Sequence, residues 1–309
     1  MKDDSSSVLI GFDGSPEAEA AIRAAGALLA PRRAVVAHVS DGIAALVSHR
    51  EALTGAAREL EGEEAREAAR IADRGAGLAE RAGLRAQPVV ARGKKAWPKL
   101  LELADEHEAE AVVVGSRGVG RVESALLGSV SAGLLGHSHL PVLIVPPLPD
   151  ERATGPVVIG YDGSDHADAA IEAAIRLLAV REAIVQTVWV SFRAVAAAGV
   201  AGAPAEVVAK GAEEIDLGLR SESERTAEKG ARLAVDGGLE ARGEAVEAQR
   251  NVWRTLLDSA ESGRAAAVVV GSHGRSALGA MLTGSVSRAL VHYAPVPVMV
   301  VRPPRARHS

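Results

Sequence analysis

A pattern of glycine and serine residues occurs twice in the chain and could bind an anion. The pattern is Gly-x2-Gly-x9-Gly-Ser, and each copy follows a run of valines. The copies consist of Gly115, Gly118, Gly128 and Ser129, and of Gly271, Gly274, Gly284 and Ser285. Glycines at the end of a strand let backbone N–H groups approach a ligand without a Cβ atom in the way. The pattern therefore predicts two phosphate sites.

The end of each pattern also predicts the start of a helix. A phosphate there would meet the unpaired N–H groups of the first turn, at the positive end of the helix dipole, and the hydroxyls of that turn. The first-turn candidates are Ser129, Val130 and Ser131, and in the second copy Ser285, Val286 and Ser287. The alternative is that the glycines only permit tight turns and close packing of helices on the sheet.

Acidic and apolar candidates follow the first and second predicted strands. Asp13 and Asp162 could accept hydrogen bonds from a ribose hydroxyl or a base amine, or could be ordinary residues of an Asp-Gly turn. Val39 and Val188 could form walls for a base, or could belong to the core. Both interpretations stay open for each pair.

Basic side chains within the patterns could pair with phosphates, or could be solvated loop charges. They are Arg117 and Arg121 in the first copy, and His273 and Arg275 in the second. Other nucleotide-binding signatures do not occur in the sequence. It has no Gly-x4-Gly-Lys-Ser/Thr, and no Gly-x-Gly-x-x-Gly follows either first strand.

The chain consists of two copies of one sequence repeat. Val8–Ser15 returns as Val157–Ser164 at an offset of 149, and Ala111–Gly118 returns as Ala267–Gly274 at an offset of 156. The second repeat thus has about seven extra residues, which we expect in the stretch Val195–Pro204 because short insertions are best tolerated in surface connections.

A length of 309 residues suits two domains. The segment from Pro146 to Pro156 is polar and rich in proline, and cannot be a central strand or helix. We therefore predict a first domain at residues 1–147, a linker at 148–156 and a second domain at 157–303.

Short apolar runs alternate with helical patterns in each repeat. In the first repeat we expect strands at Val8–Ile10, Ala34–Val39, Ala86–Val90, Ala111–Val114 and Val142–Val145. We expect helices from Pro16 to about Ala30, from Glu51 to about Arg81 with breaks at Gly62 and Gly75, from Trp97 to about His107, and from Ser129. Nearly continuous apolar strands are typical of a parallel sheet covered on both faces. The predicted fold class is α/β, with a five-stranded parallel sheet in each domain.

Composition excludes several function classes. The net charge of −5 gives no general attraction to nucleic acid, and seven aromatic residues cannot form rows of stacking side chains. The absence of cysteine excludes disulfides and thiolate chemistry. The chain starts without an apolar signal segment and has no apolar run of about 20 residues, so we expect no membrane span and a cytoplasmic protein.

The sequence does not indicate a dedicated enzyme. It has no Gly-x-Ser-x-Gly elbow and no His-Glu-x-x-His, and we interpret His137-Ser138-His139 as a helix end rather than a metal site. Phosphoryl transfer would need a basic residue for the γ-phosphate, a carboxylate for Mg²⁺ and a positioned water. No such set is recognisable, so we expect slow turnover of a bound nucleotide or none.

The motifs together resemble the universal stress protein family, over nearly the whole chain and twice. The resemblance rests on the valine run before each pattern, on Asp-Gly-Ser after each first strand, and on the continuations Gly128–Ser131 to Pro141–Val145 and Gly284–Ser287 to Pro297–Val301. It implies tandem flavodoxin-like, or Rossmann-like, domains of the ATP-binding subgroup, with ATP bound with or without Mg²⁺. It also implies that the two domains pair and that the chain forms a homodimer.

The resemblance assigns roles by position. Asp13, Val39, Asp162 and Val188 would face adenosine, and the glycines and serines of both patterns would hold ribose and phosphates. One departure weakens the second site: Gly93, after the third strand, has Gln249 as its counterpart. Trp97 and Trp253 are interpreted as helix anchors in the core.

Three functions remain open. The first is a regulatory nucleotide-sensing module for stress response or growth control, in which ATP biases the domain interface and a partner protein reads it. The second is an ATP-consuming adenylating or pyrophosphatase-type enzyme, which would need a fuller loop than Asp13-Gly14-Ser15. The third is an interaction scaffold without a nucleotide.

Overall fold

A computed structural model describes residues 6–30, 33–41, 55–118, 127–146, 155–179, 182–193, 205–274 and 284–303. The chain divides into two compact units, Met1–Asp150 and Glu151–Ser309. Most of the predicted linker and the whole predicted insertion, Val195–Pro204, lie outside the described residues, as do Arg121 and Arg275. Each unit is described by itself.

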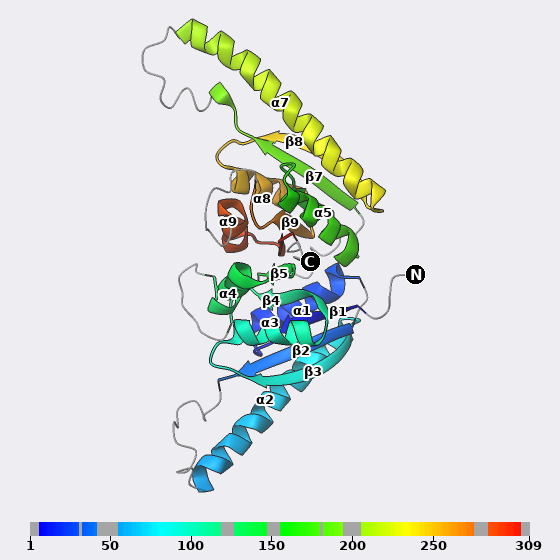
Figure 1. Cartoon of the computed structure of the whole chain (residues 1–309), viewed down its shortest axis with the longest axis vertical. Coiled ribbons are helices and arrows are strands. Elements are labelled where there is room, and N and C mark those ends of the chain that lie inside the picture. The colour runs from blue at the N-terminus through cyan, green and yellow to red at the C-terminus, as the bar shows by residue number, and fades with distance from the viewer. Residues whose placement is uncertain are drawn as a thin grey trace, which may run out of the picture. The chain divides into compact units, whose positions relative to one another are not determined.

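Strands and helices alternate in both units (Figure 1). The first unit contains β1 (Ser7–Gly11), α1 (Pro16–Leu28), β2 (Arg33–Ser40), α2 (Gly55–Arg81), β3 (Arg85–Arg92), α3 (Ala96–Glu106), β4 (Ala109–Gly115), α4 (Ser129–His137) and β5 (Val142–Val145). The second contains β6 (Val157–Gly160), α5 (Asp165–Leu177), β7 (Glu182–Trp189), α7 (Ala205–Asp236), β8 (Glu240–Glu247), α8 (Val252–Ser262), β9 (Ala267–Gly271), α9 (Ser285–Tyr293) and β10 (Val298–Val301). The predicted α/β class is confirmed.

The five strands of each unit are parallel. Their order is β3-β2-β1-β4-β5 in the first unit and β8-β7-β6-β9-β10 in the second. The chain leaves the central strand in one direction and later returns on its other side, so the order switches between β1 and β4, and between β6 and β9. Ligands of open parallel sheets bind at such a switch point, outside the carboxyl ends of the strands.

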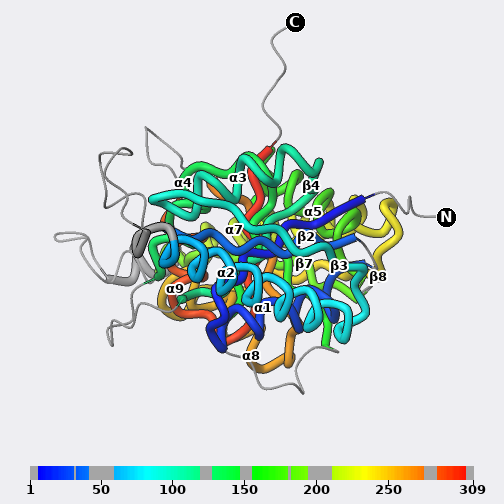
Figure 2. Tube along the Cα trace, turned by 90° about the horizontal axis from the view of Figure 1, so that it is seen from below, coloured from blue at the N-terminus to red at the C-terminus, as the bar shows by residue number. Residues whose placement is uncertain are grey.

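Helices cover both faces of each sheet. In the first unit α1 contacts α2 on one face, where the two run side by side, and α3 contacts α4 on the other (Figures 1 and 2). Successive side chains of β2 point to opposite faces, so Val36 lies against α2 and Ala37 faces the side of α3. In the second unit the corresponding pairs are α5 with α7 and α8 with α9.

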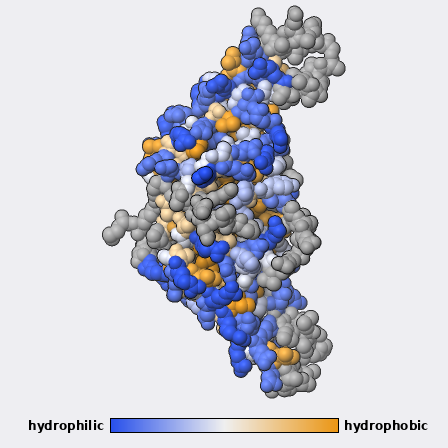
Figure 3. Space-filling model, turned by 180° about the vertical axis from the view of Figure 1, so that it is seen from behind, coloured by the Kyte–Doolittle hydropathy of each residue, from blue (hydrophilic) through white to orange (hydrophobic). Residues whose placement is uncertain are grey.

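Burial follows the predicted strand character. Every side chain of β5 is buried, and so are Val8–Ile10 and Val112–Val114. The edge strand β3 is largely exposed and contains Pro88, a residue that edge strands tolerate because no ladder hydrogen bond needs its nitrogen. The surface in Figure 3 is mostly hydrophilic, with apolar residues in scattered patches. None of the described helices combines the length and apolar character needed to cross a membrane.

The predicted breaks in α2 are wrong, because the helix is continuous through Gly62 and Gly75. Gly75 is instead a close-packing residue. A Cβ atom there would lie 2.6 Å from the ring of Phe12 and 2.8 Å from Val36. The equivalent contacts of Gly230 in α7 involve Tyr161 and Val185, at 2.7 and 2.8 Å.

The structure also corrects one pairing between the repeats. The N–H of Gly93 donates to the carbonyl of Ser40, and the same bond joins Ala248 to Trp189. Strand register therefore makes Ala248, not Gln249, the counterpart of Gly93. One extra residue follows Ala248 before α8. The offset between the repeats rises from 149 at β7 to 155 at β8, so the other six extra residues lie between these two strands.

The two tryptophans anchor helices, but not in the core. Trp97 stacks on His137 of α4 with ring centroids 4.3 Å apart, and Trp253 stacks on Tyr293 of α9 at 5.0 Å. Both tryptophans are half-buried. They join neighbouring helices on the outer side of the sheet. The prediction that α4 ends at the histidine-rich segment is confirmed, since its last residue is His137.

Candidate functional site

A cleft of about 270 Å³ opens at the carboxyl ends of β1, β2 and β4 in the first unit. The first turns of α3 and α4 close its other sides. The nine predicted site residues of the first repeat that the structure describes all line it: Asp13, Val39, Gly115, Arg117, Gly118, Gly128, Ser129, Val130 and Ser131. The fold thus brings together residues that are up to 118 positions apart in the sequence, from Asp13 to Ser131.

The start of α4 differs from the start of α1. The hydroxyl of Ser15 caps α1 by accepting a hydrogen bond of 3.1 Å from the N–H of Ala18. Gly128 occupies the cap position of α4 and has no side chain with which to do the same. Because the first N–H groups of a helix have no partner within the helix, those of α4 remain donors beside the cleft.

The three glycines of the pattern have different neighbours. A Cβ atom on Gly115 would lie 2.9 Å from Glu17 in the first turn of α1, so this glycine permits close helix–strand packing. One on Gly118 would collide with the Asp13 carboxylate. The alternative interpretation, that the glycines only permit close packing, thus holds for Gly115. Gly118 instead lies directly against Asp13, a candidate ligand-binding residue.

Ser131 holds the glycine loop in place. Its hydroxyl is buried and donates to the carbonyl of Gly115 at 2.8 Å, with a second, longer contact of 3.3 Å to that of Ser116. The hydroxyl hydrogen is therefore engaged within the loop. Ser129, two residues earlier, is exposed and lines the cleft.

Asp13 is both a turn residue and part of the cleft. Its Oδ1 accepts a hydrogen bond of 3.0 Å from the N–H of Ser15, across a turn in which Gly14 has φ +82°. The turn fixes one carboxylate oxygen, and the other lies toward Gly118. The two interpretations of this residue are thus compatible.

Sequence reasoning missed the inner wall of the cleft. The additional lining residues are Gly11, Phe12, Ala18, Ala37, His38, Ala96, Leu100 and Val114. Strand periodicity could have found Ala37, which shares a face with Val39. The Nδ1–H of His38 donates to the carbonyl of Phe12 at 2.9 Å and so joins the ends of β1 and β2. No sequence signal marks that contact.

The second unit builds the same glycine loop. The Ser287 hydroxyl donates to the carbonyls of Ser272 and Gly284 at 3.0 and 3.1 Å, and α9 also begins without a side-chain cap. A Cβ atom on Gly274 would lie 2.6 Å from Asp162, which accepts from the N–H of Ser164 at 3.1 Å.

The remaining predicted residues of the second repeat fall at equivalent places. Gly271 ends β9 against α5, His273 lies between the two loop glycines, and Val188 is near the end of β7. Ser285 and Val286 form the first turn of α9.

The side chains beneath the second loop differ from those in the first unit. Thr187 replaces His38 and donates to the carbonyl of Tyr161 at 2.8 Å. Gln186 replaces Ala37, and its Nε2 donates to the hydroxyl of Ser259 at 2.8 Å. Its Oε1 is buried and has no hydrogen-bond partner in the described part of the chain. A small apolar residue has thus become a large polar one.

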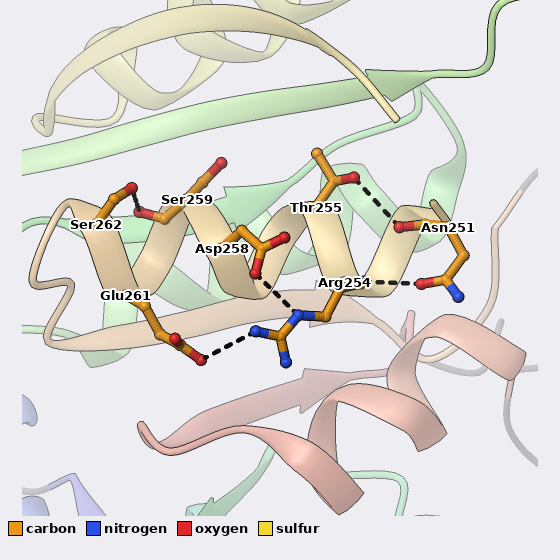
Figure 4. Close-up of polar contacts among 7 residues, drawn as sticks. All are labelled: Asn251, Arg254, Thr255, Asp258, Ser259, Glu261 and Ser262. Carbon is orange, nitrogen blue, oxygen red and sulfur yellow. Dashed lines mark hydrogen bonds and ion pairs between the residues drawn. The ribbon is translucent and has the colours of Figure 1, made fainter. Parts of the chain in front are cut away.

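The start of α8, which follows the second unit's third strand, also has a side-chain cap that the start of α3 lacks. Oδ1 of Asn251 accepts from the N–H of Arg254 at 3.2 Å, and the Thr255 hydroxyl donates to the Asn251 carbonyl (Figure 4). The Arg254 guanidinium reaches Asp258 and Glu261 on the following turns. The equivalent start of α3, at Lys95, has no side-chain cap.

Neither unit presents an evident metal site within the described residues, where no three His, Asp or Glu side chains cluster in a suitable way. What the first cleft offers is a set of backbone donors, one carboxylate, one guanidinium and an aliphatic wall. Such a set can hold a ligand with a phosphate at one end and an apolar ring at the other.

Comparisons with known proteins agree with this architecture. The sequence profile of the universal stress protein family matches residues 5–146 and 154–302. A universal stress protein of Mycolicibacterium smegmatis is 33% identical over 313 residues, covering 96% of this chain and 97% of that protein. One of Mycobacterium tuberculosis (strain H37Rv) is 33% identical over 211 residues, which is 66% of this chain and 65% of that protein, less than two thirds of its length.

Solved structures show the same fold. The crystal structure of a universal stress protein from Archaeoglobus fulgidus has a TM-score of 0.64 and covers 97% of this chain and 99% of its own. The sequence identity is 20%, so this likeness concerns the fold alone.

Proposed function

The chain belongs to the universal stress protein family, and from this membership we propose that it is a nucleotide-sensing protein that binds ATP at the glycine loops of its units. The observation that carries the proposal is the uncapped start of α4, which borders the same cleft as Gly118 and Asp13. A helix N-terminus beside a glycine loop suits a phosphate chain.

In the first unit each part of ATP has a suitable neighbour. The phosphates would lie at the first turn of α4 and near Arg117, and the ribose near Asp13. The base would lie on the aliphatic wall of Val39 and Leu100. A cleft of about 270 Å³ is slightly smaller than typical ligand pockets, so part of the phosphate chain would extend out of its mouth.

We propose a regulatory role with slow turnover or none. ATP hydrolysis needs a positioned water and a group that stabilises the transferring phosphoryl, and the cleft residues include no dedicated set for both. ATP would arrive with its own Mg²⁺. Binding would shift the population of conformers that a partner protein recognises, and a homodimer would be the species that does so.

The decisive experiment compares two single variants, in each of which one glycine is replaced by alanine. Gly118→Ala places a Cβ atom against the Asp13 carboxylate, whereas a Cβ atom at Gly62 in α2 meets nothing within 4 Å. Isothermal titration with ATP should show at least about a tenfold loss of affinity at the first unit for Gly118→Ala, equivalent to about 1.4 kcal/mol. Gly62→Ala should bind as the wild type does.

The same samples distinguish the two competing functions. Release of pyrophosphate after a co-substrate is added would favour an adenylating enzyme. Native mass spectrometry that detects no bound nucleotide at millimolar ATP would leave the scaffold interpretation and overturn the proposal.

A further inference from the structure

Two histidines lie against the glycine loop of the second unit, at positions where the first unit has a carboxylate and a guanidinium. His166, in the first turn of α5, occupies the place of Glu17 in α1. His273, inside the glycine loop, occupies the place of Arg117. The described glycines and serines of the two patterns have similar surroundings, so among the described residues this exchange is the main chemical difference at the loop.

A buried serine joins the two imidazole rings. The hydroxyl of Ser272 lies 3.0 Å from Nδ1 of His166 and 3.2 Å from Nδ1 of His273. The ring centroids are 5.2 Å apart in an edge-to-face arrangement, and the serine is fully buried. One hydroxyl can donate to one ring and accept from the other, so two neutral rings satisfy all three groups.

The surroundings of His166 favour its neutral form. Burial lowers its pKa, and the neighbouring His273 and Arg302 lower it further. Asp162 and Asp165 act in the opposite direction, but the net shift is downward from 6.5. The side chains facing this ring thus keep it uncharged near pH 7 when no anion is present. Its Nε2 has no hydrogen-bond partner among the described residues.

We propose that His166 and His273 are the phosphate ligands of the second unit, and that ATP binding there is accompanied by uptake of a proton. This inference rests on the proposed function, because it assumes that the glycine loop of the second unit receives a nucleotide. It adds that the two sites of one chain respond differently to pH.

The proton has a defined place. One ring donates its Nδ1–H to Ser272 and therefore carries a lone pair on Nε2. A proton taken from solvent at that nitrogen gives an imidazolium with a second N–H donor, which can bind a phosphate oxygen in a charge-assisted bond. No covalent bond to phosphorus forms or breaks. Arg117 needs no such step because a guanidinium stays charged at all relevant pH values.

The sign of the pH effect follows from linkage. A bound phosphate raises the pKa of the imidazole that it contacts, so affinity rises as pH falls between the bound-state and free-state values. One proton corresponds to at most about a tenfold change in affinity per pH unit. The terminal phosphate of ATP titrates near the same pH, so variants must be compared with the wild type under identical conditions.

The test exchanges the residues of the two units in the full-length chain. ATP is titrated calorimetrically at pH 6.5 in two buffers of different ionisation enthalpy, which gives the number of protons taken up. The variant H166E/H273R places the first unit's residues in the second unit. Its proton uptake on ATP binding should be lower than that of the wild type, by at most about one proton per chain. The reciprocal variant E17H/R117H should take up more.

Each outcome has one meaning. Equal proton uptake in the wild type and H166E/H273R, with ATP bound to both units, overturns the role of the histidines and leaves the proposed function intact. Binding of one ATP per wild-type chain, at the first unit, overturns the inference in the same way. Absence of ATP binding at both units overturns the proposed function and this inference together. His273→Arg alone keeps the His166–Ser272 bond, and should still lose part of the uptake if folding of the double variant fails.

Discussion

The two units share a backbone frame and differ in the side chains placed upon it. Both have an uncapped helix after a glycine loop, a serine that ties the loop down and an aspartate turn beside it. The first unit then adds alanine and arginine where the second adds glutamine and histidine. Contacts made by backbone N–H groups survive such exchanges, so under the proposed function the same backbone arrangement would form two sites that differ in affinity and pH response.

The largest effect on stability should appear at the helix–sheet contacts that are most alike in the two units. Gly75→Ala and Gly230→Ala each force a methyl group into an aromatic ring and a valine of β2 or β7. Overpacking should destabilise either unit by about 1–3 kcal/mol, less about 1 kcal/mol that alanine gains over glycine in a helix. Thermal unfolding combined with hydrogen exchange of each unit measures this. Unequal losses greater than about 1 kcal/mol would contradict the equivalence of the frames.

The next effect should separate the two loops. A Cβ atom on Gly128 would lie 3.3 Å from the Ser116 carbonyl oxygen, whereas one on Gly284 would lie 3.0 Å from that of Ser272. Gly284→Ala should therefore disturb its loop more than Gly128→Ala. We expect losses of ATP affinity of about tenfold and about threefold, respectively, with circular dichroism unchanged. Loss of secondary structure in either variant would make that glycine architectural.

Sequence reasoning recovered the fold and the backbone part of the first cleft because both depend on local patterns. Valine runs predict buried strands, and glycine spacing predicts the loop. It missed His38 because the acceptor of that side chain is the carbonyl of Phe12, on another strand. It also placed breaks in α2, since the ring of Phe12 that makes Gly75 necessary lies 63 positions away. Contacts between distant segments leave no periodic signal.

A third effect concerns a buried carboxylate of the second unit. Asp216 of α7 is buried and accepts from the Ser191 hydroxyl at 2.6 Å, the N–H of Phe192 at 2.5 Å and Arg193 at 2.9 Å. Burial raises the pKa of this carboxyl, but these hydrogen bonds outweigh it and the net shift is downward. Its stabilising contribution is therefore present above the unfolded pKa of about 4 and is lost as pH falls through the folded value.

Asp216→Asn should thus lower the melting midpoint of the second unit at pH 7 by a few degrees, and should weaken the acid dependence of that unit below about pH 4. Glu61→Gln, at the equivalent place in α2, is the matched control and should change neither. Hydrogen exchange of the segments around residues 191–193 and 216 reads the effect directly. An unchanged midpoint would show that the hydrogen bonds between Asp216 and the segment after β7 contribute nothing to stability.

The smallest effect concerns the polar pair beneath the second loop. Gln186 and Ser259 replace Ala37 and Leu103, and the buried Oε1 of Gln186 lacks a partner among the described residues. Replacing both members of a buried polar pair with well-packed apolar groups changes stability little, whereas removing one member leaves the other buried without a partner. The double variant Q186A/S259L, which restores the first unit's pair, should therefore match or exceed wild-type stability within about 1 kcal/mol, while Q186A alone should be less stable. A double variant less stable than Q186A in urea unfolding would mean that the polar pair, and not only the backbone frame, is needed to hold the second unit together.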